Sequence, residues 1–339
     1  MKQEPLVTIV IPTYNAEKTV EKCLASLKIQ KTDILYRVLV INDGSTDGTE
    51  EIVKRVIDND NRFVLLTKKN SGLSGTRNYG IQHTTTRYIT FIDPDDYVED
   101  DYIDKLTGPY LQDPDCTLSI TGYQKERENG EIIFKSDNAG ENTFSVSDAY
   151  FKIFIAGGFE GFTWNKLYCT EIIRDNNLVF DKTTEPYEDL YFDLQYLKYC
   201  QQVVWNNIVT YHYIVHDNSA IHSDRPGNRF NFDSPKKIDV LKRMIPLIPA
   251  ENKRGLNALK SKICWDELSV FRAIYAAPNK SEVPVETIQK LRKDILKYRK
   301  PFLHNEILSG KDKVIFWFNW YCPSLFAWIW NTFNLHGRG

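Results

Sequence analysis

Three carboxylates lie within four residues at Asp93-Pro94-Asp95-Asp96. They follow the apolar run 88–92, so they emerge where a buried strand is expected to end. Like charges this close together raise one another's pKa or recruit a cation. Because Mg²⁺ binds one or two carboxylates together with substrate phosphates, the pattern predicts a metal-bridged phosphate site. The alternative is an acidic turn that caps the next helix, since Asp and Pro are common in turns.

Polar residues also follow two other apolar runs of the chain, at Pro12–Asn15 and at Asn42–Ser45. The runs that we expect to form strands cover residues 6–11, 36–41, 63–66, 88–92 and 116–121. Helical segments alternate with these strands, which predicts βαβ units and an α/β fold with a mainly parallel sheet. Because ligands of such sheets bind beyond the carboxyl ends of the strands, we expect the three polar clusters to form one site.

Three side chains among the first 80 residues have types that suit a nucleotide. Tyr14 offers a ring on which a base can stack, or it packs at the rim as an ordinary aromatic residue. Asp43 can accept a hydrogen bond from a base imide, or form a local turn with Ser45. Arg77, in the glycine-rich segment 72–78, can meet a diphosphate through its planar fork, or form a surface salt bridge. The residues alone leave these alternatives open.

Four segments, taken in order, resemble the nucleotide-sugar half of a family 2 glycosyltransferase of the bacterial surface-polysaccharide type. They are VTIVIPTYN (7–15), VINDGSTDGT (40–49), NSGLSGTRNYG (70–80) and FIDPDDY (91–97). The resemblance is strong over about the first 125 residues and extends more weakly to about residue 220. It implies a GT-A, Rossmann-like fold with helices on both faces of the sheet. It also implies inverting transfer of a hexose or N-acetylhexosamine from a UDP-sugar.

By this resemblance, one group of residues would bind the nucleotide sugar: Pro12, Tyr14, Asp43, Arg77, Asp93 and Pro94. The Pro12–Tyr14 turn and Asp43 would hold the uridine, and Arg77 would lie near the base or the diphosphate. Asp93 would face the ribose. Asp95 would bind the Mn²⁺ or Mg²⁺ cofactor between the phosphates, whereas the role of Asp96 is less defined.

The segment 163–168 (TWNKLY) resembles a block of bacterial members of this family. Trp164 would suit stacking on a sugar face, and Lys166 would suit a phosphate. Lys166 could also sit on the surface, and packing is the alternative for both residues, because Trp is usually highly buried.

Glu188 and Asp189 resemble the family's Glu-Asp pair at the start of a helix. By that resemblance, Asp189 would be the general base on the acceptor hydroxyl, with Glu188 on the acceptor side. The helix dipole alone also favours acids at a helix start, so a purely structural role is the alternative.

Three histidines follow this pair at His212, His216 and His222. In family 2 enzymes a polar segment after the base often closes over the donor, so the segment 211–213 makes His212 the candidate for a metal ligand. A structural role is the alternative, because spacings of four and six residues are weak signals for a metal. Arg225 is a further candidate for the diphosphate.

Bulk composition narrows the class of protein. The chain has 339 residues, with 43 basic and 45 acidic side chains and a net charge of −2. This balance gives no electrostatic argument for nucleic acid as a partner. The six cysteines form no CxxC pair, so neither a zinc site nor a disulfide framework is expected. The first residues lack the pattern of a secretory signal, which favours a cytoplasmic protein.

The motifs and the later helical pattern predict two regions. We expect a GT-A domain over residues 1–225, with nucleotide-sugar binding in 1–125 and the acceptor side in 126–225. Amphipathic segments separated by prolines predict a helical region over residues 226–339.

The end of the helical region is an apolar tail, residues 314–335, which has no charged side chain. It contains Trp317, Trp320, Trp328 and Trp330. Because tryptophan is enriched at membrane interfaces, we expect the tail to dock at the inner face of the cell membrane, near a glycan or polyprenyl-linked acceptor. A core contact, a homodimer contact or a spanning helix are the alternatives.

Two other functions compete with sugar transfer. A sugar-phosphate nucleotidylyltransferase has a related sheet but needs a glycine-rich loop after the first strand, where this chain has Pro12–Asn15. A non-catalytic, transferase-like scaffold would not need Asp93, Asp95 and Asp189, all of which are present. We therefore expect a metal-dependent glycosyltransferase.

Overall fold

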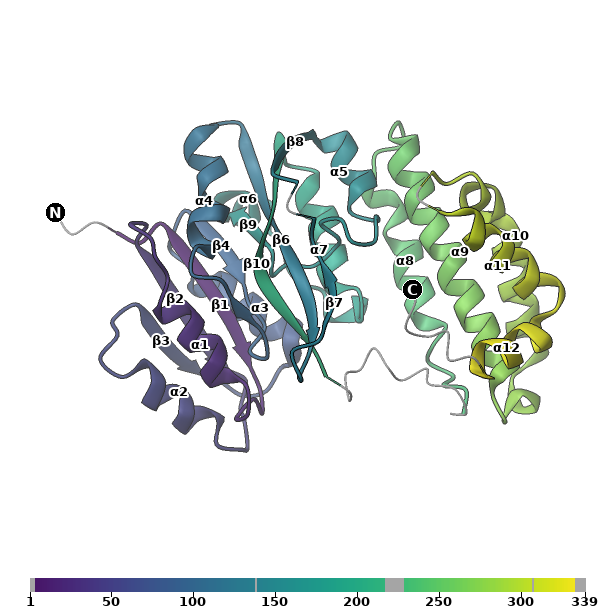
Figure 1. Ribbon diagram of the computed structural model, residues 1–339, viewed down its shortest axis with the longest axis horizontal. Helices are drawn as coiled ribbons and strands as arrows, with labels where there is room; N and C mark the ends of the chain where they lie inside the picture. The colour runs from purple at the N-terminus through teal and green to yellow at the C-terminus, as the bar shows by residue number, and fades with distance from the viewer. Residues whose placement is uncertain (1–3, 138, 217–228, 307, 333–339) are drawn as a thin grey trace. The chain divides into compact units, whose positions relative to one another are not determined.

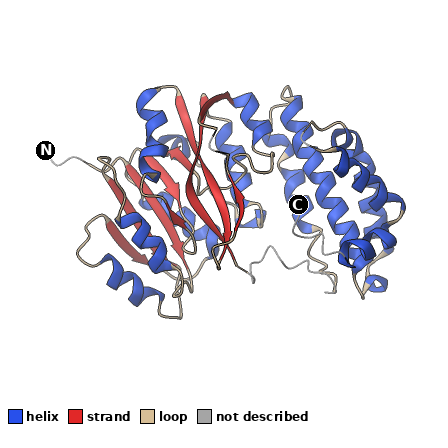
Figure 2. Cartoon of the chain, viewed as in Figure 1, coloured by secondary structure: helices blue, strands red, loops and turns tan. Residues whose placement is uncertain are grey.

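The computed structural model describes residues 4–137, 139–216, 229–306 and 308–332. The chain divides into two compact units, residues 1–216 and residues 217–339. The first unit contains a large sheet with helices, and the described part of the second unit is helical (Figures 1 and 2). The boundary predicted after residue 225 lies outside the described residues and remains a prediction.

The elements of the first unit alternate between strand and helix over its first half. The strands are β1 (Val7–Thr13), β2 (Tyr36–Asn42), β3 (Phe63–Thr67), β4 (Tyr88–Phe91), β5 (Tyr97–Val98), β6 (Cys116–Arg127), β7 (Ile132–Lys135), β8 (Glu141–Ser145), β9 (Lys166–Cys169) and β10 (Gln202–Val215). The helices are α1 (Val20–Lys28), α2 (Thr49–Ile57), α3 (Gly72–His83), α4 (Tyr102–Gln112), α5 (Val146–Lys152), α6 (Thr170–Asp175) and α7 (Glu188–Leu197), with a 3₁₀ turn at Lys182–Thr184.

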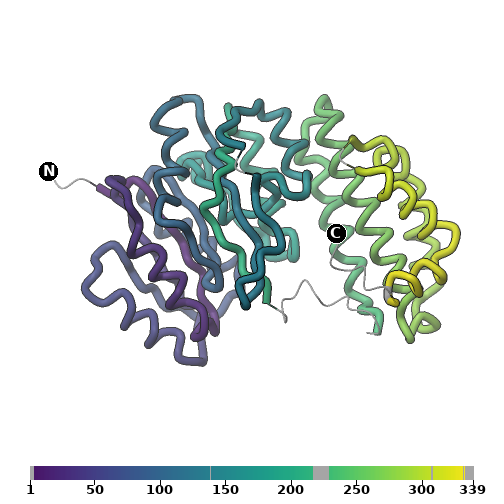
Figure 3. Tube along the Cα trace, viewed as in Figure 1, coloured from purple at the N-terminus to yellow at the C-terminus, as the bar shows by residue number. Residues whose placement is uncertain are grey.

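The described strands form one sheet, in which eight strands follow the order β3-β2-β1-β4-β9-β6-β10-β5, while β7 pairs with β6 and β8 with β10. Strands β3, β2, β1 and β4 are parallel, as predicted, and so is the long pair of β6 and β10. The short strand β9 runs antiparallel between these two groups. Figure 3 traces the chain through this unit, with the purple segments of its first residues on one side and the teal and green segments of its later residues on the other. The predicted α/β class with a mainly parallel core is therefore confirmed.

Strand β1 is buried along its whole length because helices cover both faces of the sheet. Val7, Ile9 and Ile11 join the core that α1 and α4 complete on one face. On the other face α3 comes so close that a Cβ at Gly80 would lie 2.4 Å from Cγ1 of Val10. Burial on both faces explains why this strand reads as a continuous apolar run.

The loops that follow β1, β2 and β4 begin side by side at one edge of the sheet. The N–H of Asp43 donates to the carbonyl of Thr13 at 2.8 Å, and the N–H of Ile92 donates to the carbonyl of Val10 at 3.0 Å. Parallel pairing therefore brings together the three polar clusters that the sequence separates by many residues.

The second unit is built around one long helix, α9, which α8, α10, α11 and α12 contact. Its helices are α8 (Lys236–Arg243), α9 (Lys253–Ala276), α10 (Val285–Leu303), α11 (Gly310–Tyr321) and α12 (Pro323–Thr332), with 3₁₀ turns at Ile245–Leu247 and Lys280–Glu282. This confirms the predicted helical C-terminal region.

The described part of the apolar tail is two helices, α11 and α12. Pro323 begins the second helix, at the position where a proline fits best because its missing N–H has no helical partner there. Within the described residues, no helix combines the length and the apolar character that crossing a bilayer requires.

Candidate active site

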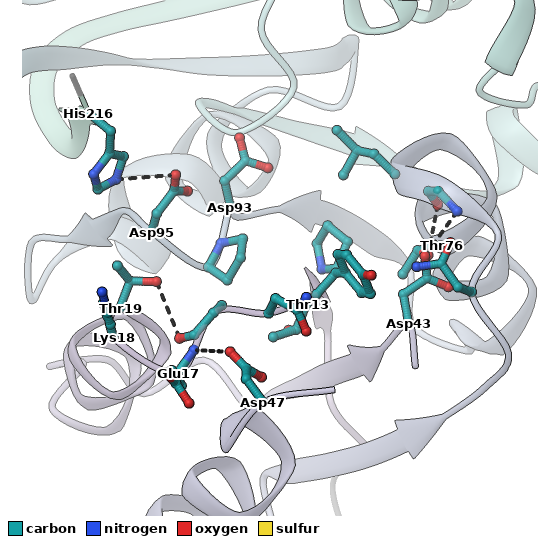
Figure 4. A pocket seen from close by; sticks show the side chains of 18 residues that line it. Thr13, Glu17, Lys18, Thr19, Asp43, Asp47, Thr76, Asp93, Asp95 and His216 are labelled. Carbon is teal, nitrogen blue, oxygen red and sulfur yellow. Dashed lines mark hydrogen bonds and ion pairs between the residues drawn. The ribbon is translucent and has the colours of Figure 1, made fainter. Parts of the chain in front are cut away.

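A pocket of about 790 Å³ opens at the edge where β1, β2 and β4 end. Its lining comes from residues 12–19 at and beyond the end of β1, Asp43 and Asp47 after β2, four residues of the segment 70–76, residues 93–95 after β4, and His216 after β10. The three clusters that the sequence placed at one edge thus share one cavity (Figure 4).

The charges of the pocket are mostly negative. Among its lining residues, Asp43, Asp93 and Asp95 are joined by Glu17 and Asp47, whereas the basic side chains are Lys18 and His216. A diphosphate entering such a pocket meets more negative than positive charge. A cation that binds with it would remove this repulsion.

Asp43 is buried, and its carboxylate holds the end of β2 to the start of α3. It accepts hydrogen bonds from the N–H groups of Ser71 at 2.9 Å and Gly72 at 3.0 Å. Lys68 Nζ makes an ion pair with the same carboxylate. Asp43 lines the pocket, so its position suits contact with a bound base while these partners fix its orientation.

Tyr14 lines the pocket with half of its surface exposed, at 51%. The neighbouring loops are tied together beside it. The N–H of Asn15 donates to Ser45 Oγ at 3.1 Å, and the N–H of Thr46 donates to Asn15 Oδ1 at 2.8 Å. An exposed ring on a fixed loop is suited to stacking on a planar ligand.

The turn after β4 separates its carboxylates into different environments. Asp93 and Asp95 line the pocket, whereas Asp96 is buried and accepts hydrogen bonds from Tyr211 Oη at 2.6 Å and from the N–H of Ile214 at 2.7 Å. Asp96 therefore anchors the turn to β10. Burial raises the pKa of Asp95, and it raises the pKa of Asp93 to about 6 despite the nearby Arg77.

His216, and not His212, is the histidine that reaches this turn. His216 Nε2 lies 3.4 Å from Asp95 Oδ2, and Figure 4 shows the two side chains pointing toward each other. His212 lies within β10, stacks on Tyr97 and has its Nε2 at 2.8 Å from Glu99 Oε1. A metal-binding role for His212 stays a prediction, and His216 is the histidine that lies beside Asp95. A strand rises about 3.3 Å per residue, so four residues separate these side chains by roughly 13 Å.

Arg77 is buried beneath the pocket, with only 1% of its surface exposed. Its Nη2 lies 3.0 Å from Asp93 Oδ1, while Nη1 makes an ion pair with Asp189 and lies 3.8 Å from Glu188 Oε1. Burial alone would lower the pKa of Arg77, but the carboxylates, led by Asp189, raise it and keep the guanidinium charged. This position differs from the predicted contact with the base or diphosphate, because both ends of the fork are occupied by carboxylates.

Asp189 and Glu188 stand in the first turn of α7, on the far side of the Arg77 guanidinium from Asp93. Asp189 Oδ2 accepts hydrogen bonds from Thr163 Oγ1 at 3.1 Å and from the Thr163 N–H at 3.3 Å. Burial and the neighbouring Asp189 raise the pKa of Glu188 to about 7. Within the described residues, Glu188 Oε2 is buried and has no hydrogen-bond partner.

Trp164 and Lys166 are both buried, and their contacts with a sugar and a phosphate stay predictions. Trp164 is 2% exposed and stacks on Tyr211, with ring centroids 4.2 Å apart. Lys166 is fully buried, where its Nζ donates to backbone carbonyls of residues 159, 160 and 162 and lies 3.3 Å from Asp193 Oδ2. A sequence pattern gives residue type and spacing, but it does not show that a lysine will be surrounded by carbonyls.

The side chains near the turn after β4 fit a divalent metal only if the substrate completes its coordination. Asp95 supplies carboxylate oxygens and His216 a ring nitrogen, in a pocket that Asp93 also lines. In the part of the chain that the structure describes, no group of three or more His, Cys, Asp or Glu side chains is placed to hold a metal ion. Mg²⁺ sites that bind nucleotides commonly have this incomplete form, because phosphate oxygens supply further ligands.

Several residues of the site carried no strong signal in the sequence. His216 follows β10 directly, so the rule that ligands bind at carboxyl ends of strands could have selected it over His212. Lys68 and Thr163 are ordinary loop residues, and their contacts with Asp43 and Asp189 depend on the packing of distant segments. The predicted candidates His222 and Arg225 lie outside the described residues.

Comparison with known proteins agrees with this architecture. A family model for glycosyl transferase family 2 matches residues 8–161. EpsH of Bacillus subtilis (strain 168), whose name places it among the glycosyltransferases, is 31% identical over 221 residues. That match covers 65% of this chain and 63% of EpsH, so this chain spans less than two thirds of that relative.

Solved structures share the fold at lower sequence identity. TarS residues 1–349 of S. aureus, in complex with UDP-GlcNAc, aligns with a TM-score of 0.59 and 15% identity, over 87% of this chain and 92% of TarS 1–349. The mannosyltransferase PcManGT of Pyrobaculum calidifontis, in complex with GDP-Man and Mn²⁺, aligns with a TM-score of 0.57 and 15% identity, over 98% of this chain and 88% of PcManGT. Residues 8–161 are thus similar to glycosyl transferase family 2, and the chain has the GT-A fold.

Proposed function

We propose that this chain is an inverting, metal-dependent glycosyltransferase. It moves a hexose or N-acetylhexosamine from a UDP-sugar to a hydroxyl of a glycan or polyprenyl-linked acceptor in polysaccharide synthesis, at the inner face of the cell membrane. The UDP-GlcNAc complex of TarS, a protein of the same fold, supports the choice of donor. The observation that carries the proposal is the Arg77 bridge, which joins the pocket-lining Asp93 to Asp189.

The donor half of the pocket would bind the nucleotide through the loops after β1, β2 and β4. Tyr14 stacks on the uracil, an interaction worth about 1–3 kcal/mol. Asp43 accepts from the base imide, while Asp93 in the Asp93-Pro94 turn faces the ribose. Their fixed positions support this assignment, because the N–H groups of α3 orient Asp43 and Arg77 orients Asp93.

Asp95, assisted by His216, would hold Mn²⁺ or Mg²⁺ against the diphosphate. When bound, such an ion supplies Lewis-acid neutralisation of the leaving group. The Mn²⁺ complex of PcManGT supports a divalent cofactor for this fold. Lys18 lines the same pocket and would add a further positive charge near the phosphates.

Asp189 would act as general base. The acceptor oxygen forms a bond to the anomeric carbon while the bond from that carbon to the diphosphate breaks. The acceptor proton passes to Asp189, and UDP leaves with the electron pair. A single displacement of this kind inverts the anomeric configuration. Arg77 and Thr163 support this role because they fix both oxygens of the carboxylate, and Glu188 Oε2 would accept from another acceptor hydroxyl.

A screen of nucleotide sugars with Mn²⁺, scored by release of free nucleotide, tests the proposal. We expect one or a few UDP-sugars to be turned over, and a general base contributes about 10²–10⁴-fold to the rate. Asp189→Asn should therefore keep UDP binding and lose nearly all release. Glu185→Gln, an exposed acid three residues before Glu188, is the matched control and should keep the wild-type rate.

Two results would contradict this assignment. Unchanged turnover in Asp189→Asn would remove Asp189 from the role of base. Binding of UDP-sugars without turnover in the wild type, across a broad set of acceptors, would favour the non-catalytic scaffold.

A further inference from the structure

The tryptophans of the two tail helices have two kinds of environment: some contact other helices of the second unit, and others lie at its surface. Trp320 on α11 lies under the guanidinium of Arg292, whose Cζ is 4.9 Å from the ring centroid. Trp330 on α12 lies 4.1 Å from the Cζ of Arg272. Both arginines belong to other helices of the bundle, so these two rings hold the tail to its own unit.

A second set of tail residues faces outward. We call this set the tail face: Val314 (67% exposed), Trp317 (37%), Tyr321 (71%), Leu325 (50%) and Trp328 (61%). Within each helix its members are three or four residues apart, which places them on one side of that helix. Large apolar side chains gathered on one surface mark an interaction site more often than isolated ones do.

The net charge of the second unit indicates the partner. Residues 217–339 contain 21 Lys and Arg against 12 Asp and Glu, a net charge of +9. Residues 1–216 contain 22 against 33, a net charge of −11, so the near-neutral total conceals two opposite units. A surface that only packs against other protein does not require acidic and basic residues to be concentrated in different units. An anionic surface, by contrast, attracts the basic unit.

Part of this basic charge lies on a helix that contacts α11. Helix α10 carries six basic and two acidic residues, and it contacts α11 where the rings of Phe302 and Phe316 are 5.3 Å apart. Its Lys293, Lys297 and Lys300 are exposed. Each basic residue near an anionic leaflet contributes about 1 kcal/mol of attraction.

We propose that the tail face docks the second unit onto an anionic lipid surface as a peripheral contact. Tryptophan and tyrosine prefer the interface between headgroups and acyl chains, and the apolar residues enter its outer part. The lysines of α10 add attraction to the headgroups. This inference deepens the membrane location given in the proposed function, but lipid binding by the tail is independent of sugar transfer.

Sedimentation of the full chain with lipid vesicles tests the proposal. Vesicles of phosphatidylcholine with about a third phosphatidylglycerol should bind the protein, and vesicles of phosphatidylcholine alone should bind it less. The double variant Trp317→Ser with Trp328→Ser should bind the mixed vesicles with an affinity reduced by a factor of about ten or more. Val285→Ser, which removes a 63% exposed apolar residue from α10, is the matched control and should bind like the wild type.

The other possible results of the vesicle experiment also decide whether the tail face binds lipid. Wild-type binding by the double variant, or no vesicle binding by the wild type, would overturn the proposal. A dimer that dissociates in the double variant, without any lipid binding, would show that a second copy covers the tail face and would also overturn it. Nucleotide release from a UDP-sugar in free solution should be the same in all these variants, so loss of lipid binding and loss of catalysis are separable.

Discussion

A single guanidinium, that of Arg77, lies between the donor-side and acceptor-side carboxylates. Asp93 lines the pocket on one side of it, and Glu188 and Asp189 stand on the other. Three carboxylates in a buried space would repel one another without this charge, so Arg77 is needed both for folding and for the geometry of the site.

Arg77→Gln should therefore affect stability and turnover together. Removing one partner of a buried ion pair costs about 3–5 kcal/mol, because the remaining charges lose their compensation. We expect a loss of that size in urea unfolding, together with loss of nucleotide release at a temperature where the variant is folded. Arg87→Gln, at an exposed position, is the matched control. Wild-type stability in Arg77→Gln would contradict the importance of the bridge.

At the scale of elements, the predictions that depend on strand ends were the most reliable. Apolar runs located the parallel strands, and the edge rule placed Tyr14, Asp43 and Asp95 in one pocket. The burial of Trp164 and Lys166 could not be predicted, because both residue types suit a ligand site as well as a core. Their surroundings come from segments that are distant in the sequence.

The two histidines of this region give a matched test of the edge rule. His216 follows the carboxyl end of β10 and reaches Asp95, whereas His212 lies inside the strand beside Glu99. His216→Gln should weaken Mn²⁺-dependent UDP binding about tenfold or more, since even indirect partners of a bound metal contribute that much. His212→Gln should leave this binding unchanged. Calorimetric titration measures both, and the reverse order of effects would restore His212 as the ligand.

Packing of α8, α9 and α10 gives a prediction about pH. Glu267 on α9 is fully buried, with Lys242 Nζ at 2.9 Å and Asp294 beside that lysine. Burial raises its pKa from an ordinary 4.5 to about 7, although Lys242 opposes the shift. The folded protein thus binds this proton more tightly than the unfolded chain does. Its contribution to stability is complete below about pH 4.5 and is lost as the pH rises through about 7.

Glu267→Gln should remove this dependence on pH. A shift of this size corresponds to about 3 kcal/mol, so the variant should lose less stability than the wild type between pH 4.5 and pH 7. Urea unfolding followed by circular dichroism at several pH values measures the difference. Glu286→Gln, at an exposed position of α10, should keep the wild-type slope. An unchanged slope in Glu267→Gln would show that Glu267 stays ionised in the folded state.

At the scale of the whole molecule, the chain joins an acidic α/β unit to a basic helical unit. The division into a glycosyltransferase fold and a helical region could be predicted from motif order and periodicity, since both are properties of sequence spacing. The net charge of the whole chain does not reveal the opposite net charges of the two units, because they nearly cancel. The outward face of the tail also could not be predicted, since all its tryptophans look alike until their neighbours are known.

In the proposed function, the loops after β1, β2 and β4 bind a UDP-sugar together with a divalent metal. A crystal structure of the protein with UDP and Mn²⁺ would show whether they do. We expect the uracil ring against Tyr14 with its imide at Asp43, and the metal bound between Asp95 and the diphosphate. UDP bound away from these three side chains, or a diphosphate with no metal at Asp95 when Mn²⁺ is in excess, would contradict it.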